Sequence, residues 1–270
     1  MSSITSPTAL HAFLESLGAK PLKALSQNFL IDANIVRKIA DSVSPDAGET
    51  ILEIGPGPGA LTEEFLKRGA RVIAIEKDPK FALALERLQT PDGRLTVHHA
   101  DILEFDFSAL RGPLKVAANL PYHITTPILE KLCENHTLFS SAHLMVQKEV
   151  AERMIAKCGS KEISSLTLFL ELYAKLTIAV SVSPHCFFPP PKVASSVVSL
   201  EFQKPPLSDP KPLIAWFRKA YQQRRKMLRS TLGIKGSAAT LRPEDLSLSD
   251  WLVLFSEQGP PLLLQSEKNG

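Results

Sequence analysis

The chain has 270 residues, of which 44% are hydrophobic and 22% are charged, a composition that excludes a disordered or fibrous protein and favours a large globular domain followed by a small one. It contains no run of about 18 apolar residues and no secretory signal, so we expect a cytoplasmic protein that does not contact a membrane. The net charge is +3, yet residues 211–242 carry nine basic side chains and no acidic one, so the remainder carries −6 (3 − 9).

Short apolar runs alternate with helical patterns through the first 150 residues. These runs predict five strands, at residues 50–54, 71–76, 95–100, 115–118 and 143–147. Apolar residues recur at helical spacing between the first three runs, namely Leu61, Phe65 and Leu66, and then Phe81, Leu85 and Leu88. Strands joined by crossover helices pair in parallel, which predicts a doubly wound, Rossmann-like α/β sheet with a ligand site at the carboxyl ends of its strands.

The pattern changes after residue 147. We expect a basic helix at residues 148–157, an apolar stretch at 166–182, and a strand at 195–202 that returns to the sheet as an antiparallel edge. A proline-rich linker at residues 203–212 precedes helical patterns at 213–232 and 246–255. The sequence therefore predicts two domains, residues 1–204 and a small all-helical, basic domain of residues 205–270.

The first predicted strand runs into a glycine-rich loop, Glu53-Ile54-Gly55-Pro56-Gly57-Pro58-Gly59, which a helix follows. Glycines let the backbone approach a ligand, and a helix N-terminus supplies free amide donors. The third glycine comes one position too early for the dinucleotide fingerprint G-x-G-x-x-G. A tight strand-to-helix turn without a ligand is the alternative interpretation.

Two acidic residues follow the next two strands. Glu76 ends the second strand, as expected of a residue that binds ribose hydroxyls, and Asp101 follows the third strand, where its carboxylate could accept from an adenine amine. Both positions indicate an adenosine-containing cofactor without specifying which one. Each acid, taken alone, is more often a helix cap or a solvated loop charge.

The tetrapeptide Asn119-Leu120-Pro121-Tyr122 follows the fourth predicted strand. The exocyclic N6 of adenine is a poor nucleophile because its lone pair is delocalised into the ring. If the Asn119 side-chain oxygen and the Leu120 carbonyl each accept one N6 hydrogen, the nitrogen becomes pyramidal and its lone pair becomes available. Pro121 stiffens the loop, and Tyr122 is placed to stack on a flipped base. An Asx-type turn before a proline is the alternative.

With three further sequence blocks, these motifs give the chain a family resemblance over nearly its full length. The blocks are Ser26-Gln27-Asn28-Phe29-Leu30, Phe187-Phe188-Pro189-Pro190-Pro191-Lys192-Val193 and Gln223-Arg224-Arg225-Lys226. The chain resembles the ribosomal RNA adenine dimethyltransferases of the kasugamycin-sensitivity and Dim1 group. The resemblance implies a class I methyltransferase sheet and S-adenosyl-L-methionine as the methyl donor. It also implies dimethylation of two adjacent adenosines in a hairpin loop near the 3′ end of small-subunit rRNA.

The resemblance also implies roles for individual residues. The cofactor-binding residues would be Asn28, Leu30, Gly55, Gly57, Glu76, Asp101 and Asn119. The catalytic residues would be Asn119 and Leu120, with Tyr122 and Phe187 sandwiching the target base. The chain departs from the usual family pattern at Ser26, at Ile163-Ser164 and at Ala194, which leaves details of the RNA contact open.

Basic side chains indicate where RNA would bind. On a continuous helix, Arg218, Arg225 and Arg229 share one face, while Leu213, Phe217 and Leu228 share another that would pack into the domain core. A second stripe of Arg153, Lys157 and Lys161 would form if the basic helix continues. With Arg224 and Lys226, these cations predict an RNA phosphate footprint, although a solvated charged face is the common alternative.

Other functions share parts of this pattern. A nicotinamide-dependent oxidoreductase would explain the glycine loop and Glu76, but not the Asn119 motif. A non-catalytic ribosome-assembly or transcription factor, or a large-subunit rRNA dimethyltransferase, would share more of it. The three cysteines and seven histidines show no metal-ligand spacing, so we expect no metal. We further expect a monomer whose partner is the rRNA of the immature small ribosomal subunit.

Overall fold

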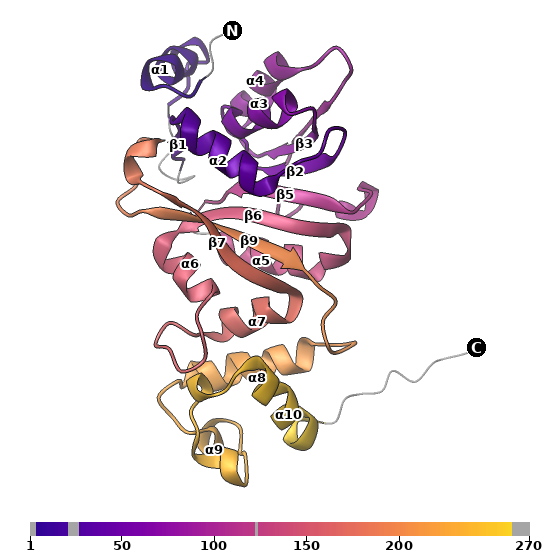
Figure 1. Cartoon of the computed structure of the whole chain (residues 1–270), viewed down its shortest axis with the longest axis vertical. Coiled ribbons are helices and arrows are strands. Elements are labelled where there is room, and N and C mark those ends of the chain that lie inside the picture. Colours follow the sequence, from indigo (N-terminus) through magenta and orange to yellow (C-terminus); the bar gives the residue numbers. More distant parts are fainter. Residues whose placement is uncertain (1–3, 21–26, 122–123, 261–270) are drawn as a thin grey trace, which may run out of the picture. The chain divides into compact units, whose positions relative to one another are not determined.

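The structure is a computed structural model that describes residues 4–20, 27–121 and 124–260. The chain forms two compact units (Figure 1). The first unit comprises the residues up to Ala151 together with Ala174–Gln203, and the second comprises Glu152–Tyr173 together with the residues from Lys204 onward. Residues 152–173 thus group with the C-terminal helices, whereas the predicted boundary at residue 204 assigned them to the first domain. Where independently folding domains begin and end stays a prediction.

A seven-stranded sheet forms the centre of the first unit, in the order β4-β3-β2-β5-β6-β9-β7. Its strands are β2 (Thr50–Ile54), β3 (Arg71–Glu76), β4 (Leu95–His99), β5 (Leu114–Asn119), β6 (Phe139–Gln147), β7 (Ala174–Val182) and β9 (Ser195–Phe202). The first five strands in this order pair in parallel, and β9 pairs antiparallel with both β6 and β7. This arrangement confirms the predicted α/β sheet with antiparallel pairing at one edge.

The edge strand itself is β7, which the sequence did not resolve. The apolar stretch predicted at residues 166–182 contains both a helix, α7 (Ser165–Tyr173), and β7. The returning strand β9 lies between β6 and β7. An apolar run that is buried as a helix and one that is buried as a strand have the same composition, so periodicity alone does not separate them.

Helices pack against both sides of this sheet (Figure 1). They are α2 (Ala33–Val43), α3 (Ala60–Lys67), α4 (Pro79–Ala84) and α5 (Thr125–Glu134), with a 3₁₀ turn at Leu85–Leu88. Helix α1 (Pro7–Ser16) packs instead against Phe29 and Phe81. Asp32 caps α2 by accepting from the Asn34 and Ile35 amides, and Asp78 caps α4 by accepting from the Lys80 amide. Val36 and Phe65 of α2 and α3 are buried in one apolar cluster with strand residues.

The second unit is helical. It contains the C-terminal end of α6 (Lys148–Met154), together with α7, α8 (Lys211–Gln222), α9 (Leu228–Thr231) and α10 (Leu248–Gln258). Phe217 of α8 lies edge-on against Trp251 of α10, with ring centroids 5.4 Å apart. Leu213 and Leu228 are fully buried, as expected for the predicted core face. The packing of α7 on α8 and α10 explains why residues 152–173 belong to this unit.

Two predicted helical stripes are wrong. The basic helix ends at Met154, so Arg153, Lys157 and Lys161 do not form a stripe along one helix. Similarly, α8 ends at Gln222 and α9 begins only at Leu228, so Arg218 and Arg229 lie on different helices and Arg225 lies between them. Both helices are shorter than the sequence pattern predicts, because tertiary contacts of the flanking backbone outweigh the local helix propensity.

Candidate active site

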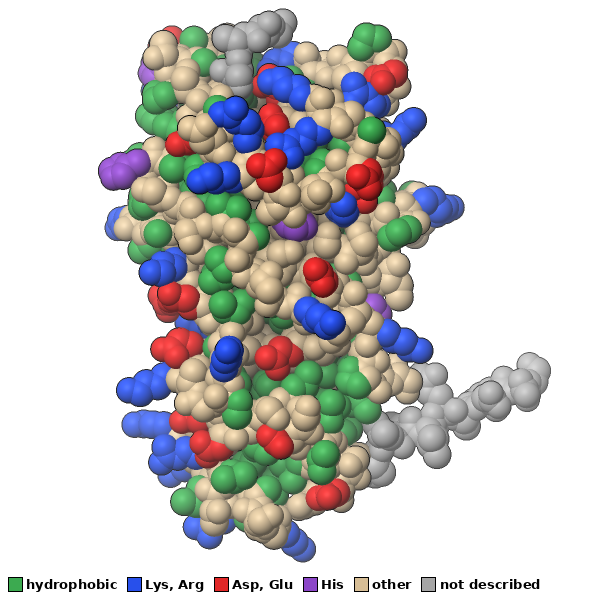
Figure 2. Space-filling view, viewed as in Figure 1, with side chains coloured by type: hydrophobic (Ala, Val, Ile, Leu, Met, Phe, Trp, Pro, Cys, Tyr) green, Lys and Arg blue, Asp and Glu red, His purple; other side chains and the backbone are tan. Residues whose placement is uncertain are grey.

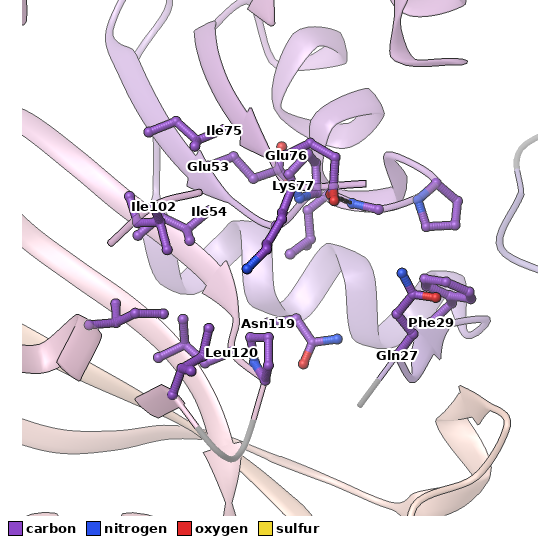
Figure 3. A pocket seen from close by; sticks show the side chains of 18 of the residues that line it. Gln27, Phe29, Glu53, Ile54, Ile75, Glu76, Lys77, Ile102, Asn119 and Leu120 are labelled. Carbon is purple, nitrogen blue, oxygen red and sulfur yellow. Dashed lines mark hydrogen bonds between the residues drawn. The ribbon is translucent and has the colours of Figure 1, made fainter. Parts of the chain in front are cut away.

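A pocket lies at the topological switch point of the sheet. From β2 the chain continues through β3 to β4 on one side, whereas β5 and β6 lie on the other side of β2. In such sheets, the carboxyl ends of the two diverging strands border a crevice that binds ligands. The pocket there is lined by the residues that follow β2, β3, β4 and β5, and by residues 27–30 (Figure 3).

The structure brings together most of the predicted catalytic and cofactor-binding residues. Those that line this one pocket are Asn28, Leu30, Gly55, Gly57, Glu76, Asp101, Asn119 and Leu120. Tyr122 and Ser26 lie outside the described residues. The roles of these residues stay predictions, but the pocket joins segments that are far apart in the sequence, such as those of Asn28 and Asn119, which are 91 positions apart.

The glycine loop after β2 needs its glycines for conformation and for space. Gly55 and Gly57 have φ angles of +64° and +53°, a region that side-chain-bearing residues rarely adopt. A Cβ at Gly57 would also lie 3.2 Å from the Phe29 ring. The Gly57 amide donates to Glu76 Oε2 at 2.8 Å, which fixes the loop against the end of β3.

Glu76 is a buried carboxylate held by two backbone amides. Its Oε2 accepts from Gly57, and its Oε1 accepts from the Asp78 amide at 2.8 Å. Burial raises the Glu76 pKa, and hydrogen bonds from the backbone amides of Asp78, Gly57 and Lys77 oppose that shift. Each carboxylate oxygen retains a second lone pair, so Glu76 can still accept from ligand hydroxyl groups.

Glu53 lies at the end of β2 and is only 2% exposed. Its Oε2 accepts from the Thr62 hydroxyl at 2.6 Å, and its side chain lines the pocket. Burial raises the pKa of Glu53 to about 8, because the charged form loses its hydration in this position. The sequence located Glu53 at the start of the glycine loop but assigned it no role. The sequence feature that could have pointed to Glu53 is a single acidic residue on a strand of mostly apolar residues.

Asp101 and Lys77 form an ion pair across neighbouring strand ends. Lys77 Nζ donates to Asp101 Oδ2 at 2.7 Å, and the Leu103 amide donates to Asp101 Oδ1 at 2.9 Å. The Lys77 ammonium is the main reason why the Asp101 pKa is lowered. Lys77 was not among the predicted site residues, although its position directly after Glu76 was a signal for it.

The Asn119 side chain has a defined orientation. Its Nδ2 donates to the Asn28 carbonyl at 2.9 Å, so the opposite end of the amide, Oδ1, is the end available to accept from a ligand.

The backbone that follows Asn119 is held by neighbouring elements. Leu120 is 2% exposed, and its amide donates to the Met145 carbonyl at 3.1 Å. The Pro121 carbonyl accepts from the Thr125 hydroxyl at 3.3 Å at the start of α5. These two contacts hold the backbone at Leu120 and Pro121.

Two of the sequence blocks pair directly. Strand β1 (Phe29–Leu30) and strand β8 (Phe187–Phe188) form a small antiparallel sheet in which Leu30 faces Phe187. Phe187 is 2% exposed and belongs to the same apolar cluster as Leu30, but unlike Leu30 it does not line the pocket. Stacking of Phe187 on a base stays a prediction, and such stacking would require the ring to become accessible.

The predicted RNA-binding cations lie in the second unit, and one of them differs from the rest. Arg224 pairs with Glu244, with Nε to Oε2 at 2.6 Å, and also donates to the carbonyls of Ser160 and Lys161. The other predicted cations have exposed side chains; they are Arg153, Lys157, Arg218, Arg225, Lys226 and Arg229. Figure 2 shows Lys and Arg side chains projecting along one edge of this unit. Arg224 is therefore built into the fold of the unit.

The described residues contain neither a metal-binding cluster nor a membrane-spanning helix. In those parts of the chain, no group of three or more His, Cys, Asp or Glu side chains is arranged to hold a metal ion. Within the same residues, no helix has the length and apolar character needed to cross a membrane.

Comparison with known proteins identifies close relatives. A family model described as ribosomal RNA adenine dimethylase matches residues 19–244. Ribosomal RNA small subunit methyltransferase A of Protochlamydia amoebophila is 45% identical, over 94% of this chain and 97% of that protein. The protein of the same name from Chlamydia caviae is 41% identical over the same shares.

Two solved structures share the fold. A dimethyladenosine transferase from Plasmodium falciparum matches with a TM-score of 0.76 and 26% identity, over 85% of this chain and 96% of that chain. The 23S rRNA methyltransferase ErmE matches with a TM-score of 0.66 and 24% identity, over 86% and 99% of the two chains. At that level of identity, the second match is evidence for the fold alone.

Proposed function

Because the chain belongs to the ribosomal RNA adenine dimethylase family, we propose that it transfers methyl groups from S-adenosyl-L-methionine to two adjacent adenosines of small-subunit rRNA. The acceptors are the N6 amines in a hairpin loop near the 3′ end, and the products are N6,N6-dimethyladenosines. Relatives named for the small subunit, at 41–45% identity, support this choice over the large subunit. The substrate is the immature small subunit in the cytoplasm.

The pocket residues fit this cofactor. Its ribose hydroxyls and adenine amine are hydrogen-bond donors, and Glu76 and Asp101 offer carboxylate acceptors at neighbouring strand ends. Apolar side chains, among them Ile54, Ile102 and Leu120, provide surfaces for the faces of a purine. When bound, the cofactor supplies an electrophilic methyl group on a positively charged sulfur.

The orientation of Asn119 is the observation that carries the proposed mechanism. Since Nδ2 is held by the Asn28 carbonyl, Oδ1 accepts one N6 hydrogen of the target adenine, and the Leu120 carbonyl accepts the other. These two acceptors localise the N6 lone pair, which attacks the methyl carbon as the carbon–sulfur bond breaks. The N6 proton leaves for solvent after the methyl group arrives, so no general base is needed. Rate enhancement comes from positioning and from oriented dipoles.

Methyl transfer onto immature small subunits tests the proposal. Wild-type protein with tritiated cofactor should label the rRNA, and nucleoside analysis should recover N6,N6-dimethyladenosine. Asn119→Ala should fold normally and lose nearly all transfer, because only the polarising acceptor is removed. Asn135→Ala is a matched control, since Asn135 lies at the end of α5 and donates to the Lys131 carbonyl away from the pocket.

Three outcomes would contradict the proposal. If the wild-type protein binds the subunit but labels no adenosine, it acts as a non-catalytic assembly factor. If Asn119→Ala retains more than half of the wild-type activity, Asn119 does not activate the amine. A nicotinamide enzyme would instead bind a dinucleotide in calorimetry and leave S-adenosylmethionine unbound.

A further inference from the structure

Lys77 places a positive charge at the wall of the pocket. It follows Glu76 directly at the end of β3 and is one of the residues that line the cavity. Figure 3 shows its side chain extending into the space between Glu76 and Asn119 in this view. The ammonium pairs with Asp101 at 2.7 Å, although the Lys77 side chain is 61% exposed and the Asp101 side chain is 20% exposed.

Both oxygens of Asp101 are engaged within the protein. Oδ1 accepts from the Leu103 amide and Oδ2 from Lys77. The Leu103 amide is not free to move, because the Asp101 carbonyl anchors the same turn by accepting from the Glu104 and Phe105 amides at 3.0 and 2.9 Å. Lys77 has four flexible methylene groups and a largely exposed side chain. Of the two partners, Lys77 is therefore the one that can move.

We propose that Lys77 is a movable cap on Asp101, whose ammonium occupies one lone pair of Oδ2 and competes there with the adenine amine of the cofactor. This inference rests on the proposed function, because it takes Asp101 as the acceptor for the cofactor's adenine. Lys77 thereby competes with the adenine amine for one carboxylate and lowers the affinity of the pocket for the adenosine moiety.

The expected effect of this competition on the affinity for the cofactor is modest. Ion pairs between exposed side chains contribute little, so removing the Lys77 ammonium should tighten binding about two- to fivefold. Salt screens such a pair, so the wild-type affinity should approach that of the variant as ionic strength rises. The sulfur charge of the ligand should not matter, because the competition concerns the adenine end.

Calorimetry on the full-length protein tests the cap. Lys77→Met, Asp101→Asn and the double variant are titrated with S-adenosylmethionine, and again with S-adenosylhomocysteine, whose sulfur is neutral. Lys77→Met should tighten both ligands equally at low ionic strength, and it should change nothing in the Asp101→Asn background. Lys80→Met is the control for loss of one positive charge, since Lys80 lies three residues away and donates to the Gly18 carbonyl. It should leave both affinities unchanged.

Each other outcome overturns the inference in a distinct way. Unchanged or weaker binding by Lys77→Met would mean that Lys77 does not compete for Asp101. If Lys77→Met binds only S-adenosylmethionine more tightly, Lys77 acts by repelling the charged sulfur. If it tightens binding equally in the Asp101→Asn background, its effect does not involve Asp101. A wild-type protein that binds neither ligand and transfers no methyl group would refute the proposed function along with the cap. Normal wild-type transfer with an unaltered Lys77→Met affinity would refute the cap alone.

Discussion

Glu76 and Glu53 are both buried carboxylates at strand ends, but they have different partners. Glu76 accepts from the backbone amides of Asp78 and Gly57, whereas the main partner of Glu53 is the Thr62 hydroxyl. Hydrogen bonds favour the charged form of a carboxylate and burial favours the neutral form, and at Glu53 burial has the larger effect. Glu76 is therefore suited to bind ligand hydroxyls, while Glu53 is suited to hold a proton inside the pocket wall.

Replacing Glu76 should weaken the cofactor site. Glu76→Ala removes the ribose acceptor and also releases the Gly57 amide, so we expect at least about tenfold weaker binding of S-adenosylmethionine. Calorimetry measures the change. Glu86→Ala provides the control, because Glu86 is exposed on the nearby 3₁₀ turn and should leave the affinity unaltered. An unaltered affinity in Glu76→Ala would remove this residue from the site.

Glu53 should make the stability of the fold depend on pH. Its folded pKa of about 8 lies above the ordinary value of 4.5, so the folded state keeps a proton that the unfolded state loses as pH rises. The stability linked to this group is complete below about pH 4.5 and is lost as pH rises through about 8. Glu53→Gln keeps the shape without the titration. Its stability relative to wild type should grow by more than about 1 kcal/mol between about pH 5 and pH 9.

Urea unfolding of the two proteins across this range measures the difference. Because the side-chain oxygen of the substituted glutamine can still accept from the Thr62 hydroxyl, the hydrogen bond in the pocket wall is retained. A constant difference between the two curves would show that Glu53 has the same protonation in both states.

In the second unit, the loop between α6 and α7 is held in place by hydrogen bonds to residues that follow α8. Arg224 donates to the carbonyls of Ser160 and Lys161 and pairs with Glu244, while the Gly159 amide donates to the Glu244 carbonyl at 2.7 Å. One arginine thus connects three segments of the second unit. Its guanidinium suits this position because it offers several donors in a rigid plane.

We predict that Arg224 and Arg225 differ in their effect on stability. Arg224→Gln leaves carbonyl groups and Glu244 without their charged partner and should cost about 1–3 kcal/mol. Arg225→Gln changes an exposed side chain and should stay within about 0.5 kcal/mol of wild type. Chemical denaturation followed by tryptophan fluorescence reports on this unit, because both tryptophans, Trp216 and Trp251, lie in it. Equal effects of the two substitutions would contradict the assignment.

Across the complete chain, the chemical site and the proposed RNA footprint belong to different units. The pocket is formed by residues 27–128, and residues 211–242 carry nine basic side chains and no acidic one. This separation predicts that affinity for RNA and affinity for the cofactor can be changed independently. Arg224 is left out of the test because its loss would disturb the fold.

Neutralising Arg225 and Lys226 together should weaken binding to the immature subunit and leave cofactor affinity unchanged. Removing one phosphate interaction should flatten the slope of log affinity against log salt by about 0.7–0.9. The control is Lys38→Gln with Lys175→Gln, which removes the same charge from exposed positions of the first unit. If the slopes of wild type and the Arg225 and Lys226 variant coincide, these cations are a solvated face and RNA binds elsewhere.

Elements whose signals are local could be predicted from the sequence. Strands β2, β3 and β9 begin and end where the apolar patterns predict, because an apolar run and its flanking turns are present in neighbouring residues. The glycine loop, Glu76, Asp101 and Asn119 could be identified for the same reason, since each follows directly on a recognisable strand.

Features that depend on partners distant in the chain became apparent only in the folded structure. They include the ends of α6 and α8, the division of residues 165–182 into a helix and a strand, and the fixed role of Arg224. The hydrogen bond that orients Asn119 joins residues 91 positions apart, and β1 pairs with β8 across more than half of the chain. Because these contacts form only when the chain closes large loops, no local pattern encodes them.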